Sequence, residues 1–396
     1  MSPALVVVII SLLLGLQPVA TDLFLPVLPD LHAELGASMA QAQLTLSALL
    51  LAFGCSQLVW GPLSDRFGRR PILLWGMSTY FLAALASAMA TSIEFLLATR
   101  AVQGVAMGAG VMCARAIVRD LHGVAEGTRV MSKGQTGLGI LACLCPMLGG
   151  LLTDWLSWRA PLMALAAFGA LTLALLIARF KESIRQKNPY ALQSVELFKT
   201  WRAILGHPTF WACSLLSAAS FGGLFTFLAT SSFVFIQGLG LTRTQYGLLM
   251  FTMPLSYIVG TIMCRILLAR LGMRRSVAVA GIVTLLGGTL LGVSVWAEAS
   301  NSWAIMLPFH LFMVGHGIHQ PCGQIGAIAP FPNAAGTASA LNGFLMMVVA
   351  FAIGGWLGLQ GLAGAEQLAQ GILFWSLLTA LTAWTLIQAH GQTRHP

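Results

Sequence analysis

A short polar stretch decides the fold of this chain: Gly61-Pro62-Leu63-Ser64-Asp65-Arg66-Phe67-Gly68-Arg69-Arg70-Pro71. It separates two long apolar runs, residues 41–60 and 72–91, in a chain of which only 8% is charged. A helix needs about 20 apolar residues to cross the core of a bilayer. The stretch is therefore predicted to form a basic turn between two membrane-spanning helices.

Composition extends this prediction to the whole chain. Of the 396 residues, 57% are apolar, and the mean hydropathy of +0.84 lies far above that of a water-soluble domain. The apolar runs are continuous, whereas a membrane β-barrel shows short alternating segments. Polar and Gly/Pro breaks divide the chain into twelve predicted helical spans: 4–28, 41–60, 72–91, 94–117, 130–153, 159–179, 209–236, 244–266, 275–296, 303–327, 336–358 and 370–389.

The basic residues predict how the chain crosses the membrane. If the 61–71 turn faces the cytoplasm, all 21 Lys and Arg residues except Arg100, Arg159 and Arg243 fall at the cytoplasmic ends of spans or beyond them. This is the positive-inside pattern, and it predicts that both termini are cytoplasmic. The net charge of +9 is then a signal of topology, and no nucleic-acid partner is expected. Residues 4–28 have no basic residue ahead of them and are expected to be a retained first span.

The longest polar stretch divides the chain in two. Residues 181–207 are predicted to be a cytoplasmic linker between an N-terminal half, residues 1–180, and a C-terminal half, residues 208–396, with six spans in each. Within the linker, residues 192–205 are predicted to form a short amphipathic helix at the membrane surface.

The two halves are weakly similar to each other. The run Arg66-Phe67-Gly68-Arg69-Arg70 recurs as Arg270-Leu271-Gly272-Met273-Arg274, again after the second span of its half. Ala269 stands in the second copy where Asp65 stands in the first. The recurrence supports a parallel duplication, as in transporters built from two six-helix halves.

Several stretches of the chain resemble the motifs of a known family. The 61–71 stretch looks like the loop signature of the major facilitator superfamily. Thr21-Asp22-Leu23-Phe24-Leu25-Pro26-Val27-Leu28-Pro29 and Arg100-Ala101-Val102-Gln103-Gly104 resemble its bicyclomycin/chloramphenicol-resistance type of drug:proton antiporters. Cys145-Pro146-Met147-Leu148-Gly149-Gly150 is similar to the antiporter motif, although Leu141 and Cys145 stand where that motif usually has glycine.

The resemblance implies an all-α membrane protein of twelve transmembrane helices in two pseudo-symmetric six-helix halves. It implies a monomeric secondary transporter of a bacterial inner membrane that exports small hydrophobic compounds or drugs by alternating access. Protons would drive export without a cofactor, and no ATP-binding GK[ST] loop is found. A specific metabolite or siderophore-like exporter is the alternative, followed by an uptake symporter. A sensor or membrane enzyme is a further alternative, but no catalytic cluster is apparent and no enzyme is expected.

The resemblance also implies a latch that closes the cytoplasmic side, with Asp65 and Arg69 near Asp120. Its predicted residues are Gly61, Asp65, Arg66, Gly68, Arg69, Arg70 and Asp120. Glycine allows a short turn to reverse direction without strain. The alternative is that the arginines only orient the chain and contact lipid headgroups.

Asp22 is the strongest single candidate for a functional residue, because it lies within the first span. A carboxylate at membrane depth costs about 2.5–3.5 kcal/mol on insertion scales and marks a functional site by default. Burial favours the neutral form, which makes Asp22 a candidate proton carrier. Arg100 is the predicted partner whose association with Asp22 couples protonation to conformation. The alternatives are an acid at the outer mouth and an arginine that reaches the headgroups.

Pro146, Gly149 and Gly150 are predicted to kink and thin the fifth span. Small residues let helices approach closely, which could seal the protein against proton leak. Ordinary packing of membrane helices is the alternative.

In the tenth span, His316 and His319 share one helix face beside Gln320. With Phe225 and Tyr257, these residues are candidates for contact with substrate or proton. The alternative is that the histidines hydrogen-bond a neighbouring helix. A metal site is not expected, because convergent ligands and an acidic partner are missing.

Overall fold

The computed structural model describes residues 2–122, 124–184, 187, 194–298, 301–359 and 364–391. Within these residues the chain is helical and contains no strand, so the predicted all-α class is confirmed. Arg185, Arg394 and part of the predicted 181–207 linker lie outside the described residues.

By their contacts, the residues form two compact units. Unit 1 comprises Met1–Ser194 and Thr242–Phe251, and unit 2 comprises Val195–Leu241 and Thr252–Pro396. The short helix α10 (Arg243–Met250) therefore belongs to unit 1, although it follows the first long helix of unit 2 in sequence. The predicted boundaries at residues 180 and 208 stay a prediction.

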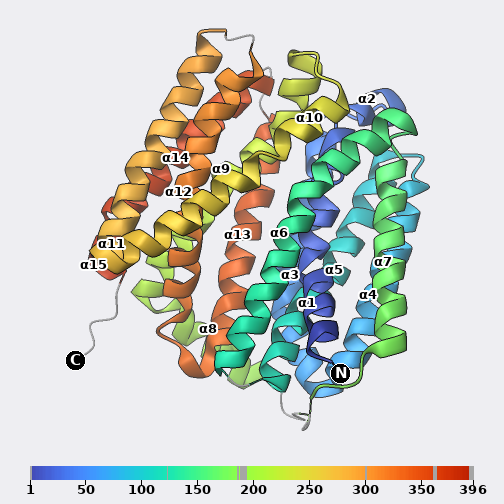
Figure 1. Ribbon diagram of the computed structural model, residues 1–396, viewed down its shortest axis with the longest axis vertical. Helices are drawn as coiled ribbons and strands as arrows, with labels where there is room; N and C mark the ends of the chain where they lie inside the picture. The colour runs from blue at the N-terminus through green and yellow to red at the C-terminus, as the bar shows by residue number, and fades with distance from the viewer. Residues whose placement is uncertain are drawn as a thin grey trace. The chain divides into compact units, whose positions relative to one another are not determined.

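Unit 1 is a bundle of long helices that run alongside one another (Figure 1). Helix α5 packs on α3 and α4, α1 packs on α6, and α4 packs on α7. Its elements are α1 (Pro3–Asp22), the 3-10 helix Leu25–Val27, α2 (Asp30–Leu35), α3 (Met39–Phe67), α4 (Arg69–Ala88), α5 (Ile93–Leu121), α6 (Val124–Trp155), α7 (Ala160–Arg179) and α10.

The end of α1 follows from its prolines. Pro26 has no N–H to donate to the carbonyl of Asp22, four residues earlier, so the regular helix ends at Asp22. The chain continues as the 3-10 helix Leu25–Val27. The predicted first span, residues 4–28, is thus a helix with a break at the carboxylate that the sequence singled out.

Unit 2 is built around the pair α11 and α12, with α9 and α14 packed against them. Its elements are α8 (Ser194–Leu205, from its second residue on), α9 (Pro208–Ser232), the π-helical turn Phe233–Gly238, α11 (Met253–Trp296), α12 (Ser302–Ile328), the 3-10 helix Pro332–Ala334, α13 (Ala335–Leu359), α14 (Gly364–Trp384) and α15 (Leu386–His390). Helix α8 confirms the helix predicted within the linker.

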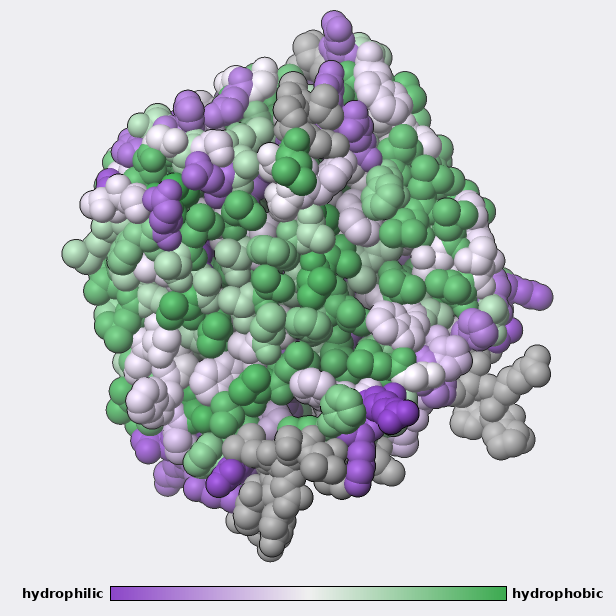
Figure 2. All heavy atoms as spheres, turned by 180° about the vertical axis from the view of Figure 1, so that it is seen from behind, coloured by the Kyte–Doolittle hydropathy of each residue, from purple (hydrophilic) through white to green (hydrophobic). Residues whose placement is uncertain are grey.

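Ten helical stretches among the described residues are long and apolar enough to cross a membrane. One of them, Arg243–Trp296, holds two crossings, because Gly272 interrupts α11. Helix α12 is 27 residues long but is not among the ten, because its histidines and Gln320 lower its mean hydropathy. Together these elements account for the twelve predicted spans. Apolar side chains cover the middle of the face in Figure 2, and polar side chains lie mainly toward its edges.

The predicted eleven-residue turn is wrong in its length. Helix α3 continues through Pro62 to Phe67, α4 begins at Arg69, and the single residue Gly68 joins them with φ of 106°. That backbone conformation is one that side-chain-bearing residues rarely adopt. Gly272, its counterpart in the repeat, also has a positive φ, 71°. The two sequence copies therefore share one local geometry.

Candidate functional site

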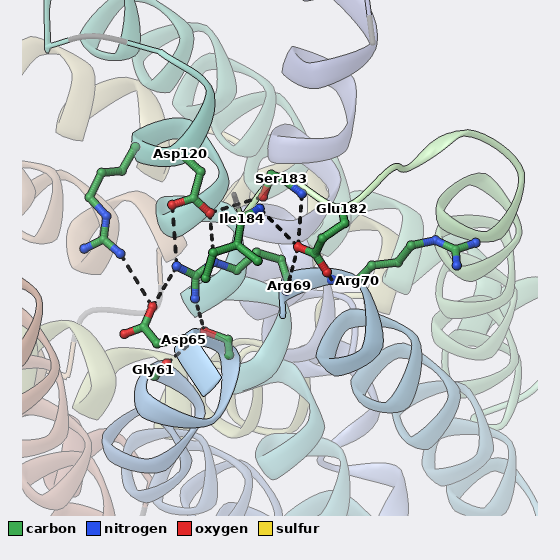
Figure 3. A network of polar contacts seen from close by, with 10 residues as sticks. Gly61, Asp65, Arg69, Arg70, Asp120, Glu182, Ser183 and Ile184 are labelled. Carbon is green, nitrogen blue, oxygen red and sulfur yellow. Dashed lines mark hydrogen bonds and ion pairs between the residues drawn. The ribbon is translucent and has the colours of Figure 1, made fainter. Parts of the chain in front are cut away.

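The residues around Gly68 form one connected polar network in unit 1 (Figure 3). The carboxylate of Glu182, which follows α7, accepts hydrogen bonds from the backbone N–H groups of Arg69 at 2.9 Å and Arg70 at 3.1 Å. It also accepts the N–H groups of Ser183 and Ile184. The first N–H groups of a helix have no partner within the helix and attract an anion. Glu182 therefore caps α4 at the glycine turn.

The Arg69 side chain is buried and joins three helices. Its guanidinium lies 2.7 Å from Asp65 on α3 and 2.9 Å from Asp120 on α5. It also donates to the hydroxyl of Ser64 at 2.6 Å. The structure thus brings Asp65, Arg69 and Asp120 together, as the resemblance implies. Hydrogen bonds between ionised groups are stronger than those between neutral groups, and one guanidinium can donate to two carboxylates at once.

The other predicted members of the latch differ in their contacts. Arg70 donates to the carbonyls of Phe180 at 3.0 Å and Ile177 at 3.4 Å, at the C-terminus of α7, where a cation is favoured. Arg66 is exposed, and its guanidinium lies 5.5 Å from the centre of the Phe67 ring. Gly61 lies inside α3 and accepts the hydroxyl of Ser64. The interpretation of Gly61 as a turn residue is therefore wrong.

Asp22 and Arg100 do not form the predicted ion pair within the described residues. Asp22 is half-buried and accepts the hydroxyl of Thr21 at 2.7 Å. Arg100 is fully buried and donates to the side chain of Gln103 and to the carbonyl of Ala20, each at 2.7 Å. Its guanidinium lies 4.6 Å from the centre of the Phe24 ring. Arg100 therefore contacts the chain on both sides of Asp22, at the backbone of Ala20 and at the ring of Phe24, and forms no ion pair with the carboxylate itself.

The small residues of α6 lie where this helix packs against two neighbouring segments. Gly149 lies against the backbone carbonyl of Leu23, and Gly150 lies against that of Arg243 on α10. Gly247 of α10 in turn lies against the carbonyl of Pro146. A side chain at any of these glycines would collide with backbone. Gly149 and Gly150 thus let α6 approach the end of α1 and the start of α10 closely, and Gly247 lets α10 approach Pro146.

A second charged cluster lies at the opposite end of α6 from its Val124 start. Arg243, at the start of α10, forms a two-contact ion pair with Asp30 and lies 3.7 Å from Asp154. Asp154 also accepts the N–H of Thr244 at 2.8 Å and its hydroxyl at 2.7 Å. One arginine and the N-terminus of α10 therefore hold two carboxylates from α2 and α6.

In unit 2, the polar residues of α12 bond to neighbouring helices. His316 shares a 2.8 Å hydrogen bond with Ser220 of α9, and Gln320 donates to the carbonyl of Ser217 at 2.9 Å. The His319 ring contacts Thr284 and the carbonyl of Val277, both on α11, at 3.5 and 3.4 Å. All three residues are buried.

The two aromatic candidates lie differently. The Tyr257 ring is half-buried, with its centre 5.7 Å from that of His316, whereas Phe225 is buried. A role in substrate or proton contact stays a prediction for all five residues. Among the described residues, no three His, Cys, Asp or Glu side chains converge as metal ligands.

Comparison with known proteins decides the family. Residues 10–355 match the model of the Major Facilitator Superfamily.

The chain belongs to the Major Facilitator Superfamily.

Relatives within this superfamily are named for drug resistance. "Multidrug resistance protein D" of Escherichia coli strain K12 is 31% identical over 339 residues, which cover 85% of this chain and 84% of that protein. "Chloramphenicol resistance protein" of Pseudomonas aeruginosa is 29% identical and covers 94% of this chain and 84% of its own. A "Bicyclomycin resistance protein homolog" of Haemophilus influenzae is 26% identical, with 88% and 86% covered. The resemblance drawn from the sequence motifs is confirmed.

Solved structures show the same superfamily fold. A D-xylose-proton symporter matches with a TM-score of 0.80 at 16% identity, over 98% of this chain and 99% of its own. The human organic anion transporter MFSD10 matches with a TM-score of 0.66 at 20% identity, over 98% and 100% of the two chains. The predicted fold class, an all-α membrane protein with the architecture of these structures, is confirmed.

Sequence reasoning missed Glu182 and the cluster of Asp30, Asp154 and Arg243. A signal existed for the cluster, because Arg243 is one of only three basic residues outside the positive-inside pattern. For Glu182 the sequence held no comparable signal, since the residue lies in the polar linker among other charges.

Proposed function

We propose that this protein exports small hydrophobic compounds, including drugs, from the cytoplasm in exchange for protons. The names of its relatives, which refer to chloramphenicol, bicyclomycin and multidrug resistance, support this substrate class. The proposed site of action is a bacterial inner membrane, and the proposed working form is a monomer embedded in lipid. The proton gradient drives the cycle without a cofactor.

The position of Asp22 is the observation that carries proton coupling. Asp22 is the last residue of α1, but it lies inside the membrane-length stretch Pro3–Val27. Every other carboxylate that the structure describes in such a stretch lies in its first or last turn, for instance Asp65, Glu94, Asp120, Asp154 and Glu366. Asp22 lies five residues before the end of the stretch Pro3–Val27, at the break in α1. Half-buried and bonded only to Thr21 among the described residues, it can exchange a proton when water reaches it.

Arg100 acts in this proposal as a positioning residue. It bonds to the backbone carbonyl of Ala20 before Asp22 and contacts the ring of Phe24 after it. Gain or loss of the Asp22 proton is then passed to α5 through these contacts with the segment around Asp22.

The proposed cytoplasmic latch is the polar network around Gly68, which is formed by Asp65, Arg69, Asp120 and Glu182. Arg69 fastens the ends of α3 and α5 to the start of α4, and Glu182 adds the segment after α7. The distribution of Lys and Arg supports a cytoplasmic position for this end, and both termini then lie on the same side. Asp30, Asp154 and Arg243 would lie at the periplasmic end.

The test is proton movement in everted membrane vesicles from cells that overproduce the protein. After respiration acidifies the vesicle lumen, chloramphenicol or another exported compound should release lumenal protons, seen as recovery of a pH-sensitive dye. Vesicles containing the Asp22→Asn protein should give no recovery. Failure of a broad drug panel in the wild type would reject multidrug antiport and favour export of one specific metabolite.

A further inference from the structure

Two cysteines of unit 2 face each other at the core of their unit. The sulfur of Cys264 on α11 lies 3.8 Å from that of Cys322 on α12. Both residues are buried, with 3% and 5% of their surface exposed. All seven cysteines are free thiols. Neither residue belongs to the proposed coupling or latch machinery.

The backbones of α11 and α12 are held close beside this pair. Gly260, one turn before Cys264, lies against the backbone of Gly317 and Val314. Cys264 also points at the carbonyl of Ile318, with its sulfur 4.0 Å away. The close packing of α11 against α12 therefore holds the two thiols side by side.

The distance between the two sulfurs indicates which reaction the pair of thiols can undergo. A disulfide bond is only about 2.05 Å long, so direct oxidation requires the sulfurs to move together. A single soft atom bound to both, with bonds of about 2.3 Å as in metal thiolates, spans up to about 4.6 Å. The observed 3.8 Å lies within that reach. Soft thiolate pairs prefer soft acceptors to the hard cations that carboxylates bind.

We propose that Cys264 and Cys322 form a dithiol site that captures trivalent arsenicals, and that capture stops transport. An arsenoxide R–As=O condenses with the two thiols: two As–S bonds form, and the As=O bond breaks. The two thiol hydrogens leave with the oxygen as one water molecule. No electrons are exchanged, so no oxidant is needed.

Capture should disturb transport because the surroundings have no spare room. Gly323, next to Cys322, lies against the carbonyl of Cys213 and the hydroxyl of Ser217 on α9. Gly326, one turn further, lies against the sulfur of Cys213. An aryl group carried by the arsenic atom must push α9, α11 or α12 out of contact. Those helices also carry the bonds of His316, His319 and Gln320.

The probe is phenylarsine oxide, added to the purified protein and followed by intact-mass spectrometry. We expect one adduct per chain, removed by 2,3-dimercaptopropanol but not by an excess of a monothiol. Cys264→Ser and Cys322→Ser should each abolish the adduct. The matched controls Cys55→Ser, at an exposed cysteine, and Cys143→Ser/Cys145→Ser should keep it.

Transport gives the second readout. In proteoliposomes, phenylarsine oxide should lower wild-type transport at least tenfold and leave Cys264→Ser, whose basal transport is expected to be normal, unaffected. An adduct that survives in Cys264→Ser or Cys322→Ser, an adduct that a monothiol removes, or no adduct at all would each overturn the site. An adduct with unchanged transport would overturn its effect on function.

Discussion

The carboxylate of Glu182 accepts the backbone N–H of Arg69 at 2.9 Å, although 113 residues separate them in the chain. This contact fastens the segment after α7 to the start of α4. The positive φ of Gly68 favours glycine, and a Cβ there would also displace the Glu182 carboxylate from this position.

Replacing Glu182 by Gln should destabilise unit 1. An anion at a helix N-terminus contributes about 0.3–2 kcal/mol, and the amide keeps the shape while losing the charge. We expect a lower thermal unfolding midpoint of the detergent-solubilised protein. Glu94→Gln is the matched control, because Glu94 is exposed like Glu182 and lies at the N-terminus of α5, but its carboxylate accepts no hydrogen bond among the described residues. Equal effects of the two substitutions would contradict a specific role for Glu182.

Replacing Arg69 by Lys should slow transport and destabilise the protein. A lysine ammonium cannot reproduce the fork that serves Asp65, Asp120 and Ser64 together. Each lost bond to a charged group is worth about 1.5–3 kcal/mol. The measurements are the initial transport rate in proteoliposomes and the unfolding midpoint. Arg66→Lys, at the exposed neighbour, should change neither. A change in substrate affinity alone, with normal cycling, would argue against the latch.

Replacing Asp22 by Asn should separate substrate binding from proton coupling. The neutral amide mimics the protonated carboxyl but cannot release a proton, so drug-induced proton release should vanish. Binding of the exported compound to purified protein, measured by calorimetry, should persist within a few-fold. Asp22→Glu is the control and should retain part of the activity. Normal proton release by Asp22→Asn would remove this residue from the mechanism.

Exchanging the charges of Arg243 and Asp30 should test the second cluster. Arg243→Asp alone places three carboxylates together and should sharply lower both yield and transport. The double variant Arg243→Asp/Asp30→Arg restores one ion pair and should recover part of both, because the interaction energy of contacting charges appears only in the double-mutant cycle. Additive losses would show that the two side chains act independently.

Much of the fold could be predicted because each membrane-spanning helix must by itself be long and apolar enough to cross the bilayer. Spans such as 94–117 and 159–179 were found within a few residues of α5 and α7, since apolar length is a local property. The error at residues 61–71 has a physical cause. Polarity marks where a helix leaves the membrane, whereas the helix itself continues until a backbone such as that of Gly68 breaks it.

The residues of the candidate site could be predicted only where they belonged to a recognised motif or departed from a general pattern of membrane proteins. The association of Arg69 with Asp120 came from a resemblance, and Asp22 came from its depth in a span. No ion pair joins Asp22 and Arg100 among the described residues, because the Arg100 guanidinium donates instead to the carbonyl of Ala20 and to Gln103. The three basic residues outside the positive-inside pattern all have specific partners. Arg159 donates to the carbonyl of Ala90, and Arg243 pairs with Asp30.

The polar face of α12 has a consequence for how the protein is made. This helix is not among the ten stretches apolar enough to cross a membrane, and its histidines and Gln320 bond to α9 and α11. A segment of this kind partitions poorly into lipid alone. Both partner helices precede it in the chain, so they have left the ribosome before it emerges. We infer that α12 enters the bilayer with their assistance, and that a change at Ser217 or Ser220 acts first on biogenesis.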